Sequence, residues 1–378
     1  MTKFWANSGD SHVLEPDDLF RERLPADLAE RMPRSEKDPD GLWETIHIDG
    51  ESFRRRLPTK PLRDEAEGLS AAERAPGAFD PDLRLKDLDQ EGIWAELIYP
   101  SISIWNASLK DPDLLRAGVV VLNDWILEFQ SHSPRFVCTA HVPLLRVQDA
   151  VAEVERVAEL GLKAAFLPVE PPPGMPTFNR EEWEPLWDVL EATGTVVGVH
   201  IGTEAHDASS YNGQYHRGPG GAVMNYFETT FGGQRMAAQL ITSGVLDRHP
   251  GLRVVVSEGG ATWGPFLADR MDEGYAQHAS AVRPKLTRRP SSYLFDQVYA
   301  SFQHDRSAVA AHTAMGWDNV LWGSDYPHVE GTFGHTQATL AALFEGVDPT
   351  ARRRILLGAF EELFPHVPAP PHEVEEAA

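Results

Sequence analysis

Cysteine is nearly absent from this sequence, which has one, Cys138, in 378 residues. A single cysteine excludes an intrachain disulfide framework and a zinc site built from several cysteines. Basic residues are also few, because 34 Lys and Arg face 57 Asp and Glu and leave a formal net charge of −23. A surface of this sign repels nucleic acid and anionic lipid, so we expect neither as a partner.

Long apolar segments are missing as well. The longest candidate, Ala117–Phe129, is interrupted by Asn123 and Asp124 and is shorter than the roughly 18 apolar residues that cross a bilayer. The first ten residues, MTKFWANSGD, lack the apolar core of a signal peptide. We therefore expect a soluble protein in the cytoplasm.

Short apolar runs alternate with longer stretches of helical periodicity along most of the chain. The runs are Phe4–Ala6, Ala95–Tyr99, Phe136–Val142, Ala164–Val169, Thr195–Ile201, Arg253–Ser257, Gln297–Phe302 and Asn319–Gly323. The helical stretches are Pro112–Ser131, Val147–Leu160, Arg180–Ala192, Asn225–Leu246, Thr262–Ala279, Arg306–Met315 and Thr336–Phe344. Eight strands separated by helices predict an α/β fold, a (β/α)₈ TIM barrel. The alternative, an open doubly wound sheet, lacks a Gly-x-Gly-x-x-Gly loop after an early strand.

Two polar segments interrupt this alternation and predict insertions. Residues 16–90 follow the first strand, and residues 203–224 follow the fifth. In a barrel both segments emerge at the C-terminal rim, where active sites lie. We expect one domain over residues 1–366, followed by a flexible acidic tail at residues 367–378.

Carboxylate and imidazole groups follow the ends of several predicted strands. They are Asp10 and His12 after the first strand, His200 at the fifth, Glu258 after the sixth and Asp325 after the eighth. Taken singly, each has an ordinary explanation, such as a helix cap, a buried core histidine or a turn. Together at one rim they predict a site for Zn²⁺, Fe²⁺ or Mn²⁺, because uncompensated charges beside apolar strands are costly.

Further polar residues are weaker candidates for the same rim. His304 follows the seventh strand and either contacts substrate or caps a helix, and His328 lies just beyond Asp325 and could orient substrate or a ligand. Glu170 ends the fourth strand, either as a metal ligand or as a carboxylate that leads into a proline-rich turn.

A basic cluster in the first insertion stands out in an acidic chain. It contains Arg54, Arg55 and Arg56, with Lys60 and Arg63 nearby. It is either a solvated loop face or a clamp for a small anionic substrate, such as a carboxylate or an acyl-CoA.

Several of these motifs resemble one family. They are the segments Gly9–Pro16, His249–Arg253, Ser257–Gly260 and Trp322–His328, together with the strand that ends in His200. The sequence is similar to the amidohydrolase-related group of metal-dependent TIM barrels, in the branch with aminocarboxymuconate-semialdehyde decarboxylase and γ-resorcylate decarboxylase. The resemblance spans Asp10 to about Phe360, apart from residues 16–90.

The resemblance implies metal ligation by Asp10, His12, His200 and Asp325. Binuclear amidohydrolases place a bridging group where Glu170 stands, so Glu170 and Glu258 could hold a second ion. The sequence departs from the decarboxylase relatives at Glu258, where those enzymes carry a histidine. A glutamate cannot be a cationic acid, which favours hydrolysis over decarboxylation.

The resemblance and the residues together predict a metal-dependent hydrolase with one or two divalent cations. Metal-activated water would attack the acyl carbonyl of an amide, ester, lactone or CoA thioester, with Asp325 as proton acceptor and Glu258 in support. The alternative is a metal-dependent, non-oxidative decarboxylase of an aromatic or muconate-type acid. A barrel that has lost its metal is the third possibility. The resemblance also allows a homodimer, because family relatives are often dimers.

Overall fold

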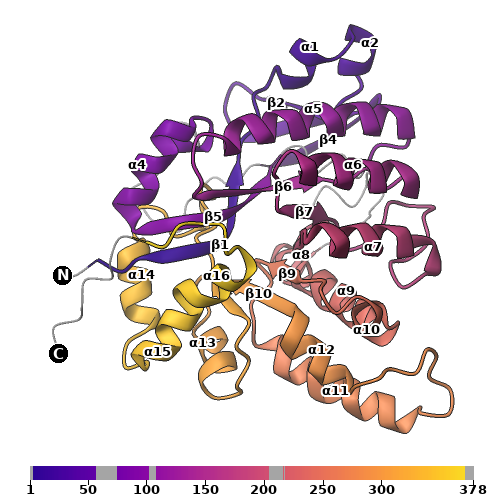
Figure 1. The fold of residues 1–378 in the computed structure, drawn as a ribbon. Helices are drawn as coiled ribbons and strands as arrows, with labels where there is room; N and C mark the ends of the chain where they lie inside the picture. The colour runs from indigo at the N-terminus through magenta and orange to yellow at the C-terminus, as the bar shows by residue number, and fades with distance from the viewer. Residues whose placement is uncertain (1–2, 57–74, 102–107, 204–215, 217, 371–378) are drawn as a thin grey trace.

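Eight parallel strands form the centre of the molecule. The protein is described here by a computed structural model that covers residues 3–56, 75–101, 108–203, 216 and 218–370. The strands lie in the order β1-β5-β6-β7-β8-β9-β10-β11, and a bridge between Ser11 and Tyr326 brings the first and last strands together. Helices surround this nearly closed sheet, with α16 beside β1 (Figure 1). The predicted TIM barrel is confirmed.

Each barrel strand overlaps one predicted apolar run. The strands are β1 (Ala6–Val13), β5 (Ile93–Pro100), β6 (Phe136–His141), β7 (Ala164–Leu167), β8 (Val196–His200), β9 (Val254–Ser257), β10 (Val298–Phe302) and β11 (Val320–Trp322). Only β1 differs greatly from its run, because it continues through Asp10 and His12. These polar residues are buried in the barrel, so polarity here does not mark the end of the strand.

The predicted helices are present, some of them divided. The helices of the barrel are α4 (Pro81–Glu91), α5 (Pro112–Gln130), α6 (Val147–Glu159), α7 (Glu184–Thr193), α8 (Gly221–Glu228), α9 (Thr230–Thr242), α10 (Val245–Arg248), α11 (Trp263–Gln277), α12 (Pro290–Gln297), α13 (Arg306–Thr313), α14 (Thr336–Leu343), α15 (Pro349–Arg353) and α16 (Ala359–Leu363). Asp111 caps α5 by accepting from two backbone N–H groups. The predicted helix Asn225–Leu246 is three helices, and a glycine with φ of 80° at position 244 precedes the last of them.

The segment after β1 forms a small layer of its own before the barrel resumes. It contains α1 (Leu19–Arg23), α2 (Ala26–Ala29) and an antiparallel sheet of β2 (Arg34–Lys37), β3 (Trp43–Ile48) and β4 (Glu51–Arg56). Buried side chains from this layer, such as Phe20 and Phe53, join the same apolar core as α5. Residues 81–91 form α4, which packs against β5 as a barrel helix.

The barrel interior is filled by side chains from alternate positions of the strands. One buried cluster contains Ala95, Leu97, Tyr99, Val137, Ala164, Phe166, Val196, Val255, Tyr299 and Leu321. Positions farther along each strand in the same alternation face the open, C-terminal mouth of the barrel.

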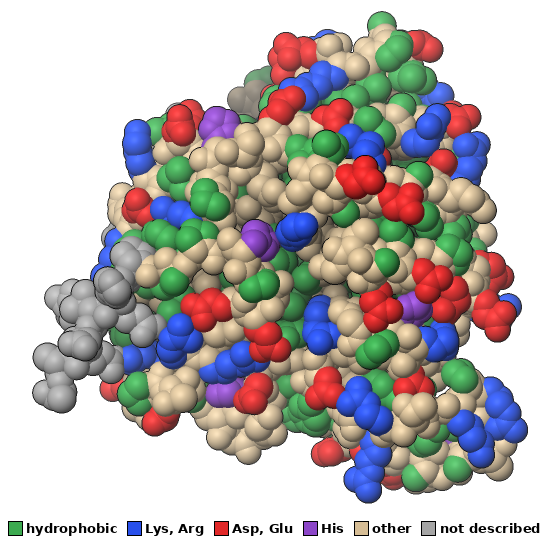
Figure 2. Space-filling model, in the orientation of Figure 1, with side chains coloured by type: hydrophobic (Ala, Val, Ile, Leu, Met, Phe, Trp, Pro, Cys, Tyr) green, Lys and Arg blue, Asp and Glu red, His purple; other side chains and the backbone are tan. Residues whose placement is uncertain are grey.

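The outer surface is charged. Acidic and basic side chains are interspersed over the face shown in Figure 2. Within the described ranges, no helix is long and apolar enough to cross a membrane.

A buried ion pair fixes the carboxyl end of β1. Arg84 of α4 and Glu96 of β5 are fully buried and paired through two hydrogen bonds. The Arg84 guanidinium also donates to the backbone carbonyl of His12 at 2.7 Å and lies 4.8 Å from the ring centre of Tyr326. One side chain therefore joins α4, β1 and the segment after β11.

Replacing Arg84 with methionine should lower the free energy of unfolding by about 3–5 kcal/mol, because Glu96 would stay buried without its partner. Urea unfolding followed by circular dichroism measures this change. The control is Arg23→Met, which breaks an exposed pair with Glu128 and should cost less than about 1 kcal/mol. Equal losses in the two variants would contradict the structural role of Arg84.

Candidate metal centre

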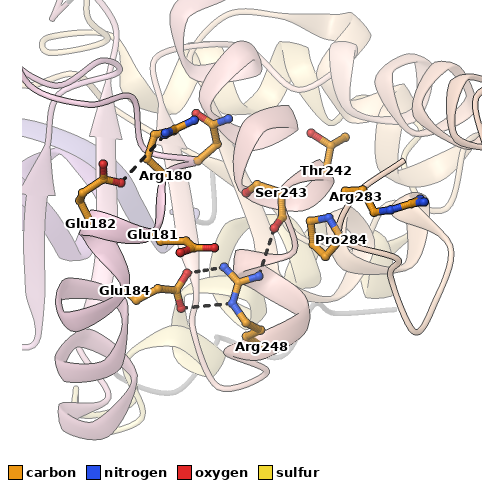
Figure 3. Close-up of a pocket in the computed structure, with 10 residues that line it drawn as sticks. Arg180, Glu181, Glu182, Glu184, Thr242, Ser243, Arg248, Arg283 and Pro284 are labelled. Atoms are coloured by element: carbon orange, nitrogen blue, oxygen red, sulfur yellow. Dashed lines mark hydrogen bonds and ion pairs between the residues drawn. The ribbon is translucent and has the colours of Figure 1, made fainter. Parts of the chain in front are cut away.

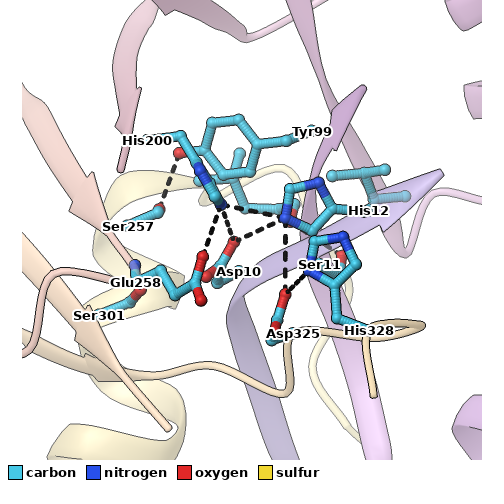
Figure 4. A network of polar contacts seen from close by, with 12 residues as sticks. Asp10, Ser11, His12, Tyr99, His200, Ser257, Glu258, Ser301, Asp325 and His328 are labelled. Atoms are coloured by element: carbon cyan, nitrogen blue, oxygen red, sulfur yellow. Dashed lines mark hydrogen bonds and ion pairs between the residues drawn. The ribbon is translucent and has the colours of Figure 1, made fainter. Parts of the chain in front are cut away.

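The strand ends bring the predicted carboxylates and imidazoles together at the mouth of the barrel. Asp10 and His12 come from β1, His200 ends β8, Glu258 follows β9 and Asp325 follows β11 (Figure 4). Residues separated by more than 300 positions in the sequence thus face one point.

The distances between these side chains fit a shared ion. His12 Nε2 lies 3.0 Å from His200 Nε2 and 3.5 Å from Asp325 Oδ1. Asp10 Oδ1 lies 3.5 Å from His200 Nε2 and 3.8 Å from His12 Nε2. Donor atoms that bind one ion at about 2.1 Å are about 3.0–3.4 Å apart, so these separations suit a site that closes slightly on binding.

The two aspartates carry the strongest sign of a missing positive charge. Both are fully buried, and neither oxygen of either carboxylate has a hydrogen-bond partner among the described residues. Burial, with the nearby carboxylates Asp10 and Glu330, raises the pKa of Asp325 well above its ordinary value. Buried carboxylates are costly unless they are paired or bind a metal, so this nitrogen and oxygen set fits a divalent cation.

Both histidines are oriented with Nε2 toward the cluster. The other ring nitrogen, Nδ1, faces a backbone carbonyl in each case, Pro100 O at 3.3 Å for His12 and Ile201 O at 2.9 Å for His200. Backbone contacts of this kind are typical of metal-binding histidines, because they fix the tautomer and the ring.

The two imidazoles differ in protonation when no ion is bound. Burial and the nearby His328 and His200 rings lower the pKa of His12 well below its ordinary value. Burial acts in the same direction on His200, but Asp10 and Glu258 outweigh it and raise the pKa to about 9. The metal-free cluster therefore balances part of its negative charge with one cationic histidine.

The backbone at the strand ends is shaped to aim the acids inward. Glu258 and Asp325 have φ values of 60° and 52°, in the left-handed region that non-glycine residues rarely adopt. Such backbone costs about 1–3 kcal/mol and occurs often at functional sites. Close approach of β11 to β1 requires glycine at position 323, where a Cβ would lie 2.7 Å from that of Asp10.

Glu258 lies at the edge of the cluster. Its Oε2 is 3.4 Å from His200 Nε2, and Asp10, Glu258 and Asp325 form one of the groups able to hold an ion. Burial and Asp325 raise the pKa of Glu258 well above its ordinary value. The side chain is therefore a buried carboxyl group beside the ligands.

His328 is closer to the cluster than the sequence indicated. Its Nδ1 is 2.7 Å from Asp325 Oδ1, and its ring stacks on His12 with centres 4.1 Å apart. The side chain is 34% exposed, so it connects the buried aspartate with solvent. His328 thus contacts the candidate ligand Asp325, and its contact with substrate stays a prediction.

Glu170 and His304, in contrast, lie apart from the cluster. The Glu170 side chain is 43% exposed and pairs with Arg235 of α9 at 3.2 Å, and it belongs to none of the ligand groups found among the described residues. The geometry therefore does not bring Glu170 to Glu258 around a second ion. His304 is exposed, and its Nε2 contacts the Glu330 carbonyl at 3.0 Å.

The predicted arginine clamp is largely outside what the structure describes. Arg54 of β4 pairs with Asp38 and lies over the Trp43 ring at 4.7 Å, so its charge is used within the small sheet. The side chains of Arg55 and Arg56 lie outside the described part of the chain, although their backbones belong to β4.

Sequence reasoning missed the support beneath the cluster. The Tyr99 hydroxyl contacts Ser257 Oγ at 2.8 Å, and the Ser257 hydroxyl donates to the Gly9 carbonyl at 3.0 Å. The Tyr99 ring lies 5.2 Å from the His200 ring. The alternation of inward and outward side chains along β5 is the signal in the sequence that places Tyr99 in the barrel interior.

A groove on the outer surface is separate from this centre. It lies beside α7 and α10 and is lined by charged residues, among them Glu184 and Arg248, that pair with one another (Figure 3). None of its lining residues belongs to the cluster. Within it Arg248 pairs with Glu184, and Arg180 lies 4.0 Å from Glu182.

Comparison with known proteins identifies the family. The model of the amidohydrolase family matches residues 45–365, most of the sequence. The chain belongs to the amidohydrolase family. The family resemblance inferred from the motifs is thereby confirmed.

Two curated relatives of this amidohydrolase are decarboxylases. Decarboxylase YanB of Aspergillus niger is 25% identical over 154 residues, which are 40% of this chain and 41% of YanB. The 6-methylsalicylic acid decarboxylase of Penicillium expansum is 27% identical over 193 residues, 50% of this chain and 56% of that enzyme. The chain thus spans about half the length of the curated relatives it matches.

Solved structures share the fold over nearly the whole chain. An amidohydrolase from Mycobacterium avium subsp. paratuberculosis has a TM-score of 0.75 at 22% identity, covering 96% of this chain and 99% of that one. A dihydroxybenzoic acid decarboxylase from Polaromonas sp. JS666, with bound manganese, has a TM-score of 0.64 at 17% identity, covering 97% and 98%. A divalent cation is bound in that relative of the same fold.

The predicted hydrolase activity, with its thioesterase variant, is corrected by these relatives, which are decarboxylases. The sequence argument gave too much weight to the missing histidine at position 258. A buried carboxyl group with a raised pKa can hold and donate a proton, as an imidazolium can. Glu258 is therefore no obstacle to decarboxylation.

Purification with added Mn²⁺ should yield about one bound ion per chain, and Asp325→Asn should reduce that ratio by more than half because a ligand is lost. Elemental analysis measures the ratio. Glu170→Gln is the matched control, since it removes a carboxylate outside the cluster and should keep the full ratio. Less than about 0.2 ions in the wild-type protein, or equal losses in both variants, would contradict the site.

The metal-free protein should lose stability relative to Glu258→Gln as pH rises from about 4.5, the ordinary range of a glutamate pKa. The raised pKa means that the folded state holds this proton more tightly than the unfolded chain, so the stabilisation is complete at low pH and is lost up to the folded pKa. Thermal unfolding of both proteins between pH 5 and 8 measures the difference. A difference that does not change with pH would contradict the shift.

Proposed function

We propose that the protein is a metal-dependent, non-oxidative decarboxylase of a small aromatic carboxylic acid. The observation that carries the proposal is the decarboxylase activity named for the curated relatives. The cluster at the barrel mouth supports it, because it contains the groups that such a reaction requires.

Asp10, His12, His200 and Asp325 would hold the divalent cation. When bound, such a cation supplies a positive charge that attracts a substrate carboxylate and a neighbouring hydroxyl oxygen and stabilises developing negative charge. The substrate would be a small anion bound at the barrel mouth. A net charge of −23 gives the protein no overall attraction for anions, so the positive charge at the site itself would have to attract the substrate.

The reaction needs an acid and no oxidant. The bond between the ring carbon and the carboxylate breaks, its electron pair stays on the ring carbon, and a proton takes the place of the departing CO₂. Glu258 is placed to supply this proton, because its carboxyl group lies within the cluster and its pKa is raised. The proton would come from the carboxyl group that the sequence argument regarded as unsuitable.

His328 would connect this chemistry with solvent. It contacts Asp325 at 2.7 Å and is partly exposed, so it forms a polar link between the buried aspartate and solvent. A homodimer and a cytoplasmic location remain predictions from the sequence.

Incubation of the manganese-loaded protein with 2-hydroxybenzoic acids, 6-methylsalicylic acid among them, should release CO₂. In D₂O the product should carry deuterium at the carbon that lost its carboxylate. Glu258→Gln should lower the rate by about 100-fold or more, because the proton donor is removed. Mass spectrometry and CO₂ detection measure these outcomes.

Glu170→Gln is the matched control and should keep the wild-type rate, since that carboxylate pairs with Arg235 outside the cluster. Binding of these acids without release of CO₂ would contradict the proposed decarboxylation. An unchanged rate in Glu258→Gln would remove Glu258 as the acid.

A further inference from the structure

A buried serine lies next to Glu258 at the mouth of the barrel. Ser301 lies on β10 two residues beyond Tyr299, which belongs to the interior cluster. Side chains two positions apart on a strand point to the same side, so Ser301 also faces the barrel interior. Its side chain is fully buried, and Figure 4 shows it beside Glu258 at the edge of the candidate ligands.

The Ser301 hydroxyl forms a hydrogen bond with the backbone of Glu258. The ladder between β9 and β10 ends with the pair Val256 and Ala300. Two residues beyond Val256, the Glu258 N–H donates to Ser301 Oγ at 3.0 Å, and this is the hydrogen bond that the N–H forms among the described residues. A side-chain contact thus joins the two strands where their backbone contacts end.

Glu258 depends on this contact because its own backbone is strained and the residues after it are permissive. Its φ of 60° lies in the left-handed region, which is unfavourable for a residue other than glycine. The next two residues are glycines, whose backbones adopt many conformations and do not by themselves fix Glu258. Beyond them, Trp263 Nε1 donates to the Gly260 carbonyl at 2.7 Å, so Ser301 and Trp263 anchor the two sides of this turn.

The carboxyl end of Glu258 has a contact that a bound cation would remove. Oε2 lies 3.4 Å from Nε2 of His200. That nitrogen is a candidate metal ligand, and a ring nitrogen that binds a cation has no proton to donate. In the metal-loaded protein, the direction of the Glu258 carboxyl would then depend on its backbone and therefore on Ser301.

Ser301 is itself held on a central strand. β10 lies between β9 and β11, and Ser301 pairs with Leu321 of β11. On its inner side β1 passes so close that a Cβ at Gly9 would lie 3.4 Å from the Cβ of Ser301. Serine places a hydrogen-bond acceptor in this narrow space with one heavy atom beyond Cβ.

We infer that Ser301 is a positioning residue for Glu258: its hydroxyl oxygen accepts the Glu258 N–H, holds the left-handed turn and keeps the carboxyl group directed at the cluster. This inference rests on the proposed function, in which that carboxyl group supplies the proton. Ser301 acts through Glu258 and does not contact substrate. Because proton transfer requires close alignment of donor and acceptor, a displaced carboxyl group reacts more slowly.

Ser301→Ala removes the hydroxyl and keeps the Cβ. In the manganese-loaded variant, kcat for CO₂ release should fall about tenfold or more, whereas KM and metal content should stay within about twofold of the wild-type values, because the ligands are unchanged. Ser301→Cys keeps a side chain of similar shape with a weaker acceptor, so its kcat should lie between those of wild type and Ser301→Ala. A crystal structure of metal-free Ser301→Ala should show the Glu258 carboxyl displaced by about 1 Å or more.

The matched control is Thr139→Val. Thr139 is fully buried and lies two residues beyond Val137 of the interior cluster, as Ser301 lies two beyond Tyr299. Its hydroxyl donates to the Ile98 carbonyl at 3.1 Å, so the variant also loses a buried hydrogen bond. Thermal unfolding should show similar losses of stability for Thr139→Val and Ser301→Ala, whereas Thr139→Val should keep the wild-type kcat.

A double variant tests whether Ser301 acts through Glu258. Adding Ser301→Ala to Glu258→Gln should lower kcat by less than about twofold, because the group that the serine positions is already gone. An equal fall of kcat in both backgrounds would assign the effect to another part of the site.

The outcomes distinguish this positioning role from the proposed function. That equal fall, an unmoved Glu258 carboxyl in Ser301→Ala, or a loss of kcat as large in Thr139→Val overturns the role of Ser301 while decarboxylation stands. Absence of CO₂ release from the wild-type protein overturns the proposed function, and the crystal structures then decide whether Ser301 directs Glu258.

Discussion

Two buried carboxylates without hydrogen bonds are the constraint on which the site depends. Asp10 and Asp325 approach each other from β1 and from the end of β11, and among the described residues only histidine rings, those of His12, His200 and His328, lie within ion-pair distance of their oxygens. Like charges in a buried position repel, and burial raises the pKa of Asp325. A divalent cation between the carboxylates would offset this repulsion, and the Nε2 atoms of His12 and His200 complete a set of candidate ligands for it.

The surrounding fold is built to hold these groups against their repulsion. Arg84 fixes the end of β1 from below through the His12 carbonyl, and Tyr99 and Ser257 support His200 and the Gly9 backbone. Left-handed backbone at Glu258 and Asp325 adds strain where the acids turn inward. Contacts of the buried core, which surrounds the barrel on all sides, offset this local cost. The candidate metal ligands thus lie at and beside strained backbone in a barrel with an extensive buried core.

Much of the fold and of the candidate site could be predicted from the sequence, because both follow from the order of strands in a barrel. Apolar runs located all eight strands, and the polar residues in or after them located the candidate ligands, because a parallel barrel gathers its carboxyl ends at one rim. The directions in which side chains of the loops point could not be predicted from the sequence. Glu170 has the right residue type at the right strand end, yet three prolines follow it and its carboxylate turns to Arg235 on α9.

The activity was misjudged at a single residue, and the reason is physical. An imidazolium and a protonated carboxyl group differ in charge, but both can give a proton to carbon if the surroundings keep them protonated. For a surface glutamate the comparison fails, because its pKa lies far below neutral pH. Burial and Asp325 both raise the pKa of Glu258, so this glutamate differs less from a histidine in its ability to hold a proton. Residue identity at position 258 therefore does not separate hydrolysis from decarboxylation. The environment that the barrel imposes on that residue does more to decide which chemistry it can support.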